Sequence, residues 1–128
     1  MSVVPYLTIA GGRGAEAADF YTKLFNAEPG TRMPAEDGKR LMHCALQFAG
    51  SWLYLSDEFR ERPQSTPAMS SVFVGLNKPA EVDALVAKAK GMGATVTQEP
   101  QDMFWGDRFA MFTDPFGHSW QVGASKAA

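Results

Sequence analysis

The sequence predicts an α+β fold of two tandem βαβββ modules, which form a curved mixed sheet with a central cleft and place their helices outside. Two observations support this fold: the second half of the chain repeats the first, and both halves show the same order of β-rich and helical runs. Because one unit is used twice, we expect a pocket between the copies, and two copies are too few for a solenoid, which needs at least about three stacked units. The repeat, at a spacing of 65 positions, matches Ala15-Glu16, Phe20, Tyr21 and Lys23 with Ala80-Glu81, Leu85, Val86 and Lys88.

The first module is expected to span residues 1–56. Apolar side chains at helical spacing predict a helix from Ala15 to Phe25, and Pro29-Gly30 stops it. Two β-rich runs meet at Ala49-Gly50, a short connection typical of a hairpin. The expected strands are Val3 to Ile9, Thr31 to Met33, Leu41 to Phe48 and Ser51 to Ser56.

The second module is expected to span residues 70–124, after a connector over residues 57–69 that is charged, contains prolines and has little to bury. Pro79 favours the first turn of a helix that runs to about Lys90. Asp114-Pro115-Phe116-Gly117 predicts a tight turn between the last two strands. The expected strands are Ser71 to Leu76, Ala94 to Gln98, Phe109 to Thr113 and Ser119 to Gly123.

Composition excludes several classes of partner. The chain has 128 residues with 12 basic and 14 acidic side chains and no basic run, so we expect neither a nucleic acid nor a membrane as partner. It shows no signal peptide and no membrane-length apolar span, which predicts a cytoplasmic protein. Cys44 is alone, so it forms no intramolecular disulfide, and we expect it to be buried as a small apolar residue.

Alternation along the strands separates a helix-packing set of side chains from an opposite set. The helix-packing set is apolar and consists of Met42, Cys44, Leu46, Phe48, Leu53, Leu55, Val72, Val74 and Leu76. The opposite set is aromatic with a few polar groups, the usual composition of a small-molecule pocket. With Trp105 from a loop, it gives the expected ligand-binding residues: Tyr6, Thr8, His43, Trp52, Tyr54, Ser71, Phe73, Trp105, Arg108, Phe112 and Gln121.

His43 and Arg108 are the candidate catalytic residues. A histidine on the cleft face suits a general base near neutral pH, although a hydrogen-bonded histidine that orders a loop fits the pattern equally well. The planar guanidinium of Arg108 suits a carboxylate or phosphate if it points into the cleft. The alternative is that an Asp-Arg or Asp-backbone contact involving Asp107 pins the loop of Trp105. The aromatic residues either stack on a flat ligand or fill the cleft.

Several motifs along the chain resemble one known family. They are Pro5-Tyr6-Leu7, Asp19-Phe20-Tyr21, Met42-His43-Cys44-Ala45-Leu46, Leu55-Ser56-Asp57, Met103-Phe104-Trp105-Gly106-Asp107-Arg108-Phe109 and Asp114-Pro115-Phe116-Gly117-His118-Ser119-Trp120. With the repeated unit, they resemble the PhnB-like branch of the vicinal-oxygen-chelate superfamily over nearly the whole chain. That superfamily includes glyoxalase I, bleomycin-resistance proteins, fosfomycin-resistance enzymes and extradiol dioxygenases, and its members commonly form homodimers, which the resemblance implies here.

The resemblance also implies where a metal would bind. Metal enzymes of the superfamily place ligands on the first and last strands of each module, and these positions match Tyr6, Tyr54, Ser71 and Gln121. Divalent transition metals prefer imidazole, carboxylate or thiolate ligands, and none of these four residues supplies one. We therefore expect no metal and no other cofactor. The alternative is an unforeseen metal site that uses His43.

The sequence leaves three hypotheses for the function, each from a different class of protein. The first, and the expected one, is a PhnB-like, glyoxalase/bleomycin-resistance-type protein whose aromatic, metal-free cleft binds or sequesters an unknown small molecule. The second is an enzyme of unknown reaction, a glyoxalase- or dioxygenase-like lyase or oxidoreductase that uses His43 or Arg108. The third is a structural or interaction role in which the cleft is filled.

Overall fold

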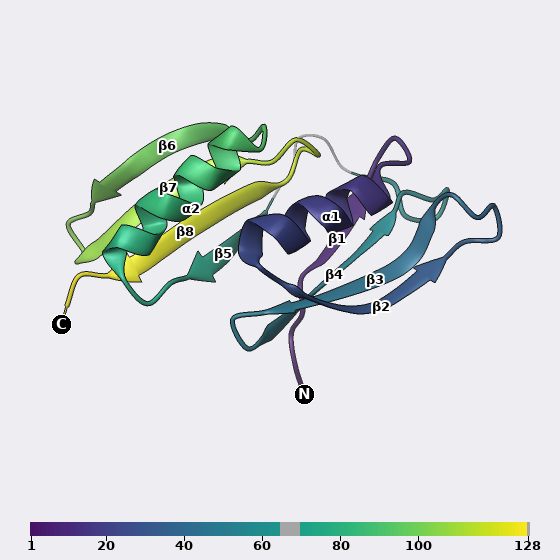
Figure 1. The fold of residues 1–128 in the computed structure, drawn as a ribbon, viewed down its shortest axis with the longest axis horizontal. Helices are drawn as coiled ribbons and strands as arrows, with labels where there is room; N and C mark the ends of the chain where they lie inside the picture. Colours follow the sequence, from purple (N-terminus) through teal and green to yellow (C-terminus); the bar gives the residue numbers. More distant parts are fainter. Residues whose placement is uncertain (65–69, 128) are drawn as a thin grey trace. The chain divides into compact units, whose positions relative to one another are not determined.

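The computed structural model describes residues 1–64 and 70–127, in two compact units, Met1–Ser65 and Thr66–Ala128 (Figure 1). The described residues form two helices and eight strands, one helix and four strands in each unit. Neither helix of these ranges is long and apolar enough to cross a bilayer. Each unit contains one βαβββ module, and each is described separately.

Module one has the predicted βαβββ order. Its four-stranded sheet has the order β1-β4-β3-β2, in which β1 runs parallel to β4 and the other neighbours are antiparallel. A short turn at Ala49 and Gly50, both with positive φ, joins β3 to β4 as the sequence predicts. The elements are β1 (Tyr6–Ile9), α1 (Gly14–Phe25), β2 (Glu28–Pro34), β3 (Leu41–Phe48) and β4 (Ser51–Asp57).

Module two repeats that topology. Its sheet has the order β5-β8-β7-β6, again with one parallel pair, β5 and β8, and two antiparallel pairs. The α+β fold of two βαβββ modules is therefore confirmed, with two separate four-stranded sheets. The cleft between the modules stays a prediction. The elements are β5 (Ser71–Gly75), α2 (Pro79–Gly91), β6 (Thr95–Asp102), β7 (Asp107–Thr113) and β8 (Ser119–Ser125).

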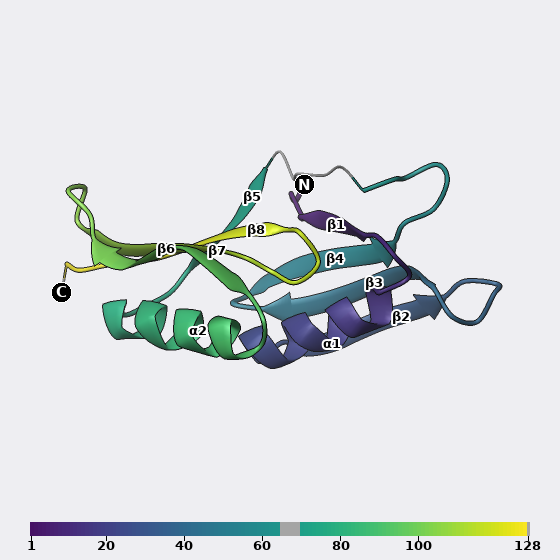
Figure 2. The same ribbon diagram turned by 90° about the horizontal axis from the view of Figure 1, so that it is seen from above.

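The core of module one lies between α1 and one face of its sheet (Figure 2). The helix is amphipathic, so its apolar stripe, which includes Tyr21 and Leu24, is buried against the sheet. Cys44 is 2% exposed, as expected for a small apolar residue. Burying these side chains fixes which face of the sheet is covered and leaves the other face for function. The sheet contributes Leu7, Ile9, Cys44, Leu46, Leu53 and Leu55.

A buried carboxylate ties this module together at the end of β4. The Asp57 Oδ1 accepts the Gly14 backbone N–H at 2.7 Å, and its Oδ2 accepts the Leu41 N–H at 2.6 Å. A Cβ on Gly14 would lie 2.6 Å from the Asp57 Cγ, so only glycine fits at the start of α1. Asp57 is thus part of module one, and the expected connector does not begin at residue 57.

Residues 58–64 are also built into module one, as a turn that we call the clamped turn. The Glu58 N–H donates to the Ile9 carbonyl at 2.8 Å, and the Ala10 N–H donates to the Gln64 Oε1 at 2.6 Å. Between these anchors, Phe59 and Arg62 form a β-bridge. The rest of the expected connector, residues 65–69, lies outside the described residues.

The core of module two lies between α2 and its sheet, and a second buried carboxylate fixes one end of it. Val82 and Val86 of the helix pack on a face that contains Phe112, Trp120 and Val122. Asp114 accepts the indole N–H of Trp120 at 2.8 Å, and it also accepts the backbone N–H groups of Phe116 and His118. These bonds hold the predicted tight turn against the core.

Candidate ligand-binding site on module one

Four aromatic side chains gather on the face of module one that is opposite α1. Tyr6 of β1 and Tyr54 of β4 are directly paired in register, and His43 of β3 and Trp52 of β4 lie on the same face. Their neighbours along β4, Leu53 and Leu55, are buried on the helix side, as the alternation predicts. We call Tyr6, His43, Trp52 and Tyr54 the aromatic cluster.

The cluster is held by one hydrogen bond and by ring contacts. The Tyr6 Oη lies 2.9 Å from the His43 Nδ1. The ring centroids of His43 and Tyr54 are 5.0 Å apart, those of Tyr6 and Tyr54 are 5.9 Å apart, and those of Trp52 and Tyr54 are 6.3 Å apart. Among the described residues His43 forms no other side-chain hydrogen bond, so its Nε2 has no protein partner there.

Part of the cluster remains accessible to solvent. Tyr6 is 43% exposed and Trp52 is 39% exposed, which is high for such large apolar side chains. A Cβ on Gly30 would lie 3.0 Å from the Trp52 Cζ3, so this glycine allows the indole to lie close to β2. The sequence showed Gly30 only as a helix stop and gave no sign of this contact.

Arg62 of the clamped turn lies at the edge of the cluster. Its guanidinium carbon is 5.9 Å from the centroid of the Tyr6 ring, and its Nη1 is 3.4 Å from the Tyr6 Oη. Its Nη2 is 3.9 Å from the Met42 Sδ. Sequence reasoning missed Arg62 because the clamped turn is anchored by hydrogen bonds and shows no apolar pattern.

Alternation predicted that Met42 lies under the helix, but this is wrong, because the residue is 40% exposed. The pairing of β2 with β3 shifts between Met33 and Pro34, so Met42 falls at an irregularity that breaks the alternation. Its sulfur reaches Arg62 instead of the core.

A shallow hollow of about 500 Å³ lies beside Met42. The guanidinium carbon of Arg40 lies 4.3 Å from the centroid of the Phe59 ring, and its Nε forms an ion pair with the Asp37 Oδ2 at 2.7 Å. Backbone and side-chain hydrogen bonds from Arg40, with another from Lys39, hold the pKa of Asp37 well below its usual value. The hollow is lined by Ala35, Glu36, Asp37, Arg40, Met42 and Phe59.

The remaining expected residues with open-face positions are dispersed over both modules. Thr8 is half-buried two residues after Tyr6, on the same strand. In module two, the Ser71 hydroxyl bonds to the Ser119 hydroxyl at 3.0 Å, and Phe73 is paired in register with Gln121. The Trp105 indole donates to Asp107 at 3.2 Å, a side-chain contact other than the Asp-Arg or Asp-backbone contact expected for this loop.

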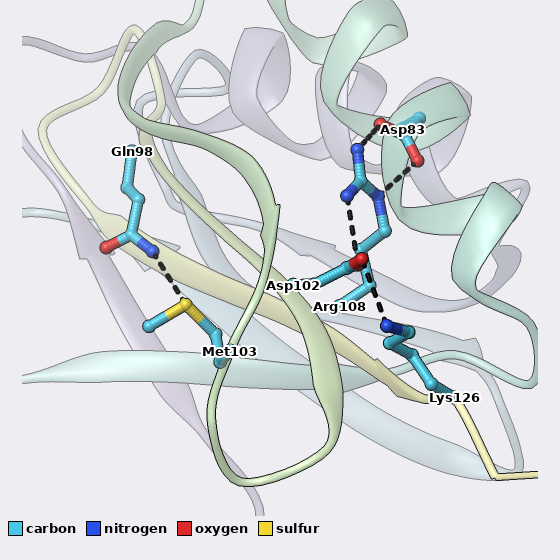
Figure 3. Close-up of polar contacts among 6 residues, drawn as sticks. All are labelled: Asp83, Gln98, Asp102, Met103, Arg108 and Lys126. Carbon is cyan, nitrogen blue, oxygen red and sulfur yellow. Dashed lines mark hydrogen bonds and ion pairs between the residues drawn. The ribbon is translucent and has the colours of Figure 1, made fainter.

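Arg108 does not point away from the helix, so the expectation that it faces the cleft is wrong. Its Nε and Nη2 each donate to Asp83 of α2 at 2.8 Å (Figure 3). Its Nη1 donates to Asp102 at 3.1 Å, and Asp102 also accepts Lys126 at 3.0 Å. The two carboxylates raise the pKa of Arg108, and these cations lower the pKa values of Asp83 and Asp102.

Phe112 is also wrongly placed by the sequence. It is 0% exposed and stacks on Trp120 with ring centroids 6.4 Å apart, so it belongs to the core under α2 and does not contact a ligand. The register pairs Phe112 with Trp120, and directly paired residues share a face. Because Phe109 and Met111 are also apolar, alternation within β7 did not show which face is buried.

The donors at the positions implied for a metal do not fit one. Tyr6 and Tyr54 supply two phenols, Ser71 a hydroxyl and Gln121 an amide, whereas divalent transition metals prefer imidazole, carboxylate or thiolate. Within residues 1–64 and 70–127, no group of three or more His, Cys, Asp or Glu is placed to hold a metal ion.

The family profile of the Glyoxalase/Bleomycin resistance protein/Dioxygenase superfamily matches residues 3–122. The chain belongs to this superfamily. The uncharacterized protein Mb0911c of Mycobacterium bovis is 36% identical over 114 residues, which cover 85% of this chain and 74% of the relative. The uncharacterized protein Rv0887c of Mycobacterium tuberculosis has the same identity, but the chain covers only 66% of its length.

Solved structures share the whole fold. Protein PA1353 from Pseudomonas aeruginosa has a TM-score of 0.82 and 26% identity, with 98% of each chain covered. A Bacillus cereus PhnB protein, described as a putative 3-demethylubiquinone-9 3-methyltransferase, has a TM-score of 0.78 and 21% identity, covering 98% of this chain and 100% of its own. The fosfomycin resistance protein FosX of Listeria monocytogenes, complexed with Mn(II) and sulfate, has a TM-score of 0.72 and 16% identity, covering 98% and 94%. At these identities the last two show the fold alone.

Proposed function

We propose that this superfamily member binds or sequesters a small organic molecule on the aromatic cluster of module one, without a metal ion. The observation that carries the proposal is the Tyr6–His43 hydrogen bond of 2.9 Å within a partly exposed group of four rings. A cluster that served only as core would be buried. This one combines accessible ring surface with a fixed polar pair, as small-molecule sites do.

The cluster offers two kinds of contact. Its rings stack on a flat ligand, and each such aromatic contact contributes about 0.5–1.5 kcal/mol beyond burial. The Tyr6 hydroxyl and the His43 Nε2 offer hydrogen bonds that orient the ligand. Because the Nδ1 is already engaged by Tyr6, the His43 ring is held in one orientation before the ligand arrives.

The comparisons support a placement in the PhnB-like branch with a bleomycin-resistance type of function. The superfamily profile spans most of the chain, and the fold of the Bacillus PhnB protein covers nearly all of it. With that placement we propose a homodimer in the cytoplasm, with a small molecule and neither nucleic acid nor membrane as partner.

The second candidate is an enzyme in which His43 acts as general base. It is favoured by the same hydrogen bond, because a histidine oriented through one nitrogen has the other available for a proton. Mass spectrometry of a ligand recovered from the protein separates the two functions. A bound molecule returns unchanged, whereas a substrate returns as a product that the variant His43→Gln does not form.

An NMR titration of isotope-labelled protein with 4-nitrobenzamide, a flat neutral probe, tests the site. We expect saturable shifts centred on Tyr6, His43 and the Trp52 indole, with a dissociation constant in the millimolar range, since even the roughly 0.3 kcal/mol per non-hydrogen atom of drug-sized ligands gives this affinity for so small a probe. Trp52→Ala weakens binding several-fold. Phe104→Ala, which removes a 96% exposed ring of module two, is the matched control and leaves binding unchanged. Shifts centred elsewhere contradict the proposal.

A further inference from the structure

We propose that Arg62 makes the aromatic cluster selective for ligands that carry a negative charge, with a carboxylate as the preferred group. This inference rests on the function proposed above, because it assigns the chemical class of the ligand at that site. It concerns a residue outside the strands, supplied by the clamped turn.

The first step is that Arg62 is held in place. The clamped turn is bonded to module one at both ends, through Glu58 to the Ile9 carbonyl and through Gln64 to the Ala10 N–H. Within the turn, the Arg62 N–H donates to the Phe59 carbonyl at 2.9 Å. The side chain is therefore delivered to the edge of Tyr6 by a short, anchored segment.

The second step is that the charge of Arg62 is not neutralised. Over the described ranges Arg62 forms no ion pair, and its contacts are the Tyr6 hydroxyl, the Met42 sulfur and two ring faces. The carboxylate of Glu58, on the same turn, accepts the Gln64 N–H at 2.6 Å instead. Other arginines are paired with acids, namely Arg13 with Glu16, Arg32 with Asp19, Arg40 with Asp37 and Arg108 with Asp83.

The third step is that the contacts Arg62 does make are weak and easily replaced. Both polar contacts are long for hydrogen bonds. The Nη1 lies 3.4 Å from the Tyr6 Oη, and the Nη2 lies 3.9 Å from the Met42 sulfur. A carboxylate accepts both arms of the guanidinium fork at shorter distances and with opposite charge. When the His43 Nδ1 donates to Tyr6, the Tyr6 hydroxyl is also free to donate to the same anion.

The test uses a matched pair of probes, 4-nitrobenzoate and 4-nitrobenzamide, which differ in charge and hardly in shape. We expect wild-type protein to bind the carboxylate about tenfold more tightly at low salt, the effect of one charge-assisted contact, with a preference that shrinks as salt screens the exposed guanidinium. Arg62→Gln lowers the affinity for the carboxylate and so removes the preference. Arg62→Lys keeps part of it, because the charge remains without the fork.

Arg60→Gln is the control, because Arg60 is an exposed arginine on the same turn and its loss changes the net charge equally. If Arg62 acts through its position, Arg60→Gln leaves the preference for the carboxylate intact. If Arg60→Gln reduces the preference as much as Arg62→Gln does, only net charge matters and the proposal is overturned. Equal binding of both probes by wild type refutes the role of Arg62 while the aromatic site stands. Binding of neither probe refutes the site itself, and with it this inference.

Discussion

Modules one and two share one topology but present different chemistry on their open faces. In module one, the face opposite the helix carries a tyrosine–histidine pair among accessible rings. In module two, the corresponding face carries a serine pair and Phe73, and the charged residues Arg108 and Asp83 lie on the helix side. The order of strand pairing sets the scaffold, whereas the side chains that alternate outward set the chemistry.

The modules also differ in how tightly their small residues are enclosed. Gly14 of module one faces the buried Asp57 carboxylate, which cannot move without losing two hydrogen bonds. Gly123 of module two faces the ring of Phe73, which is 55% exposed and free to turn away. We therefore expect equal substitutions to have unequal effects in the two modules.

The largest effect is expected for Asp57→Ala, because it leaves the N–H groups of Gly14 and Leu41 without their acceptor in a buried place. The free energy of unfolding falls by about 3 kcal/mol, the usual cost of two such orphaned donors. Urea denaturation measures it. Asp57→Asn keeps one acceptor oxygen, so its free energy of unfolding lies between those of wild type and the alanine variant. A loss under 1 kcal/mol for the alanine variant would show that water replaces the carboxylate.

A smaller loss, about 2 kcal/mol, is expected for Gly14→Ala, because overpacking a rigid site typically costs this much. The control is Gly91→Ala at the end of α2, where a Cβ meets no atom within 4 Å. Denaturation curves of the two variants check the difference. If Gly14→Ala is as stable as the control, the tie between α1 and Asp57 is looser than the distances indicate.

Gly123→Ala is expected to cost less than about 1 kcal/mol, although its Cβ would lie 3.0 Å from the Phe73 ring. The ring moves outward at little cost, so Gly123→Ala changes the free energy of unfolding by about the same amount in wild type as in the Phe73→Ala variant. A double-mutant cycle measures this coupling. A loss comparable to that of Gly14→Ala would show that both modules are equally rigid.

The smallest effect concerns the acids around Arg108. Their folded-state pKa values are lowered, so their contribution to stability is present above the unfolded value near 3.8 and is lost as the pH falls through the folded values. Thermal melts of wild type and Asp83→Asn should differ slightly at pH 6 and converge as the pH falls below the unfolded value and through the folded one. The difference is small because these carboxylates are about half exposed. Curves that stay parallel at all pH values contradict the assignment.

The sequence predicted the fold and the shared face of the cluster residues for identifiable reasons. Strict alternation in β1 and β4 put Tyr6, Trp52 and Tyr54 on one face, because the opposite positions are clearly apolar. It failed for Arg108 and Phe112, because β7 is apolar on both faces and only its register with β8 separates them. A register of this kind is set by contacts distant in sequence.

Arg62 and Met42 escaped prediction for another reason. The clamped turn is fixed by backbone groups, which every residue carries, so its composition resembles that of a free linker. Met42 lies at an irregularity in the pairing of β2 with β3, and no residue type in the sequence predicts that irregularity. The parts of the site that depend on such local backbone detail become visible only in three dimensions.

The exposed sulfur of Met42 beside Arg62 has a consequence for handling the protein under air. A thioether is a weak acceptor, but oxidation to the sulfoxide creates a polar S=O group on the same side chain. With the Met42 Sδ 3.9 Å from the Arg62 Nη2, that oxygen would bind the guanidinium and occupy it. Aged preparations would then lose discrimination between charged and neutral ligands, and treatment with methionine sulfoxide reductases would restore it without any change of sequence.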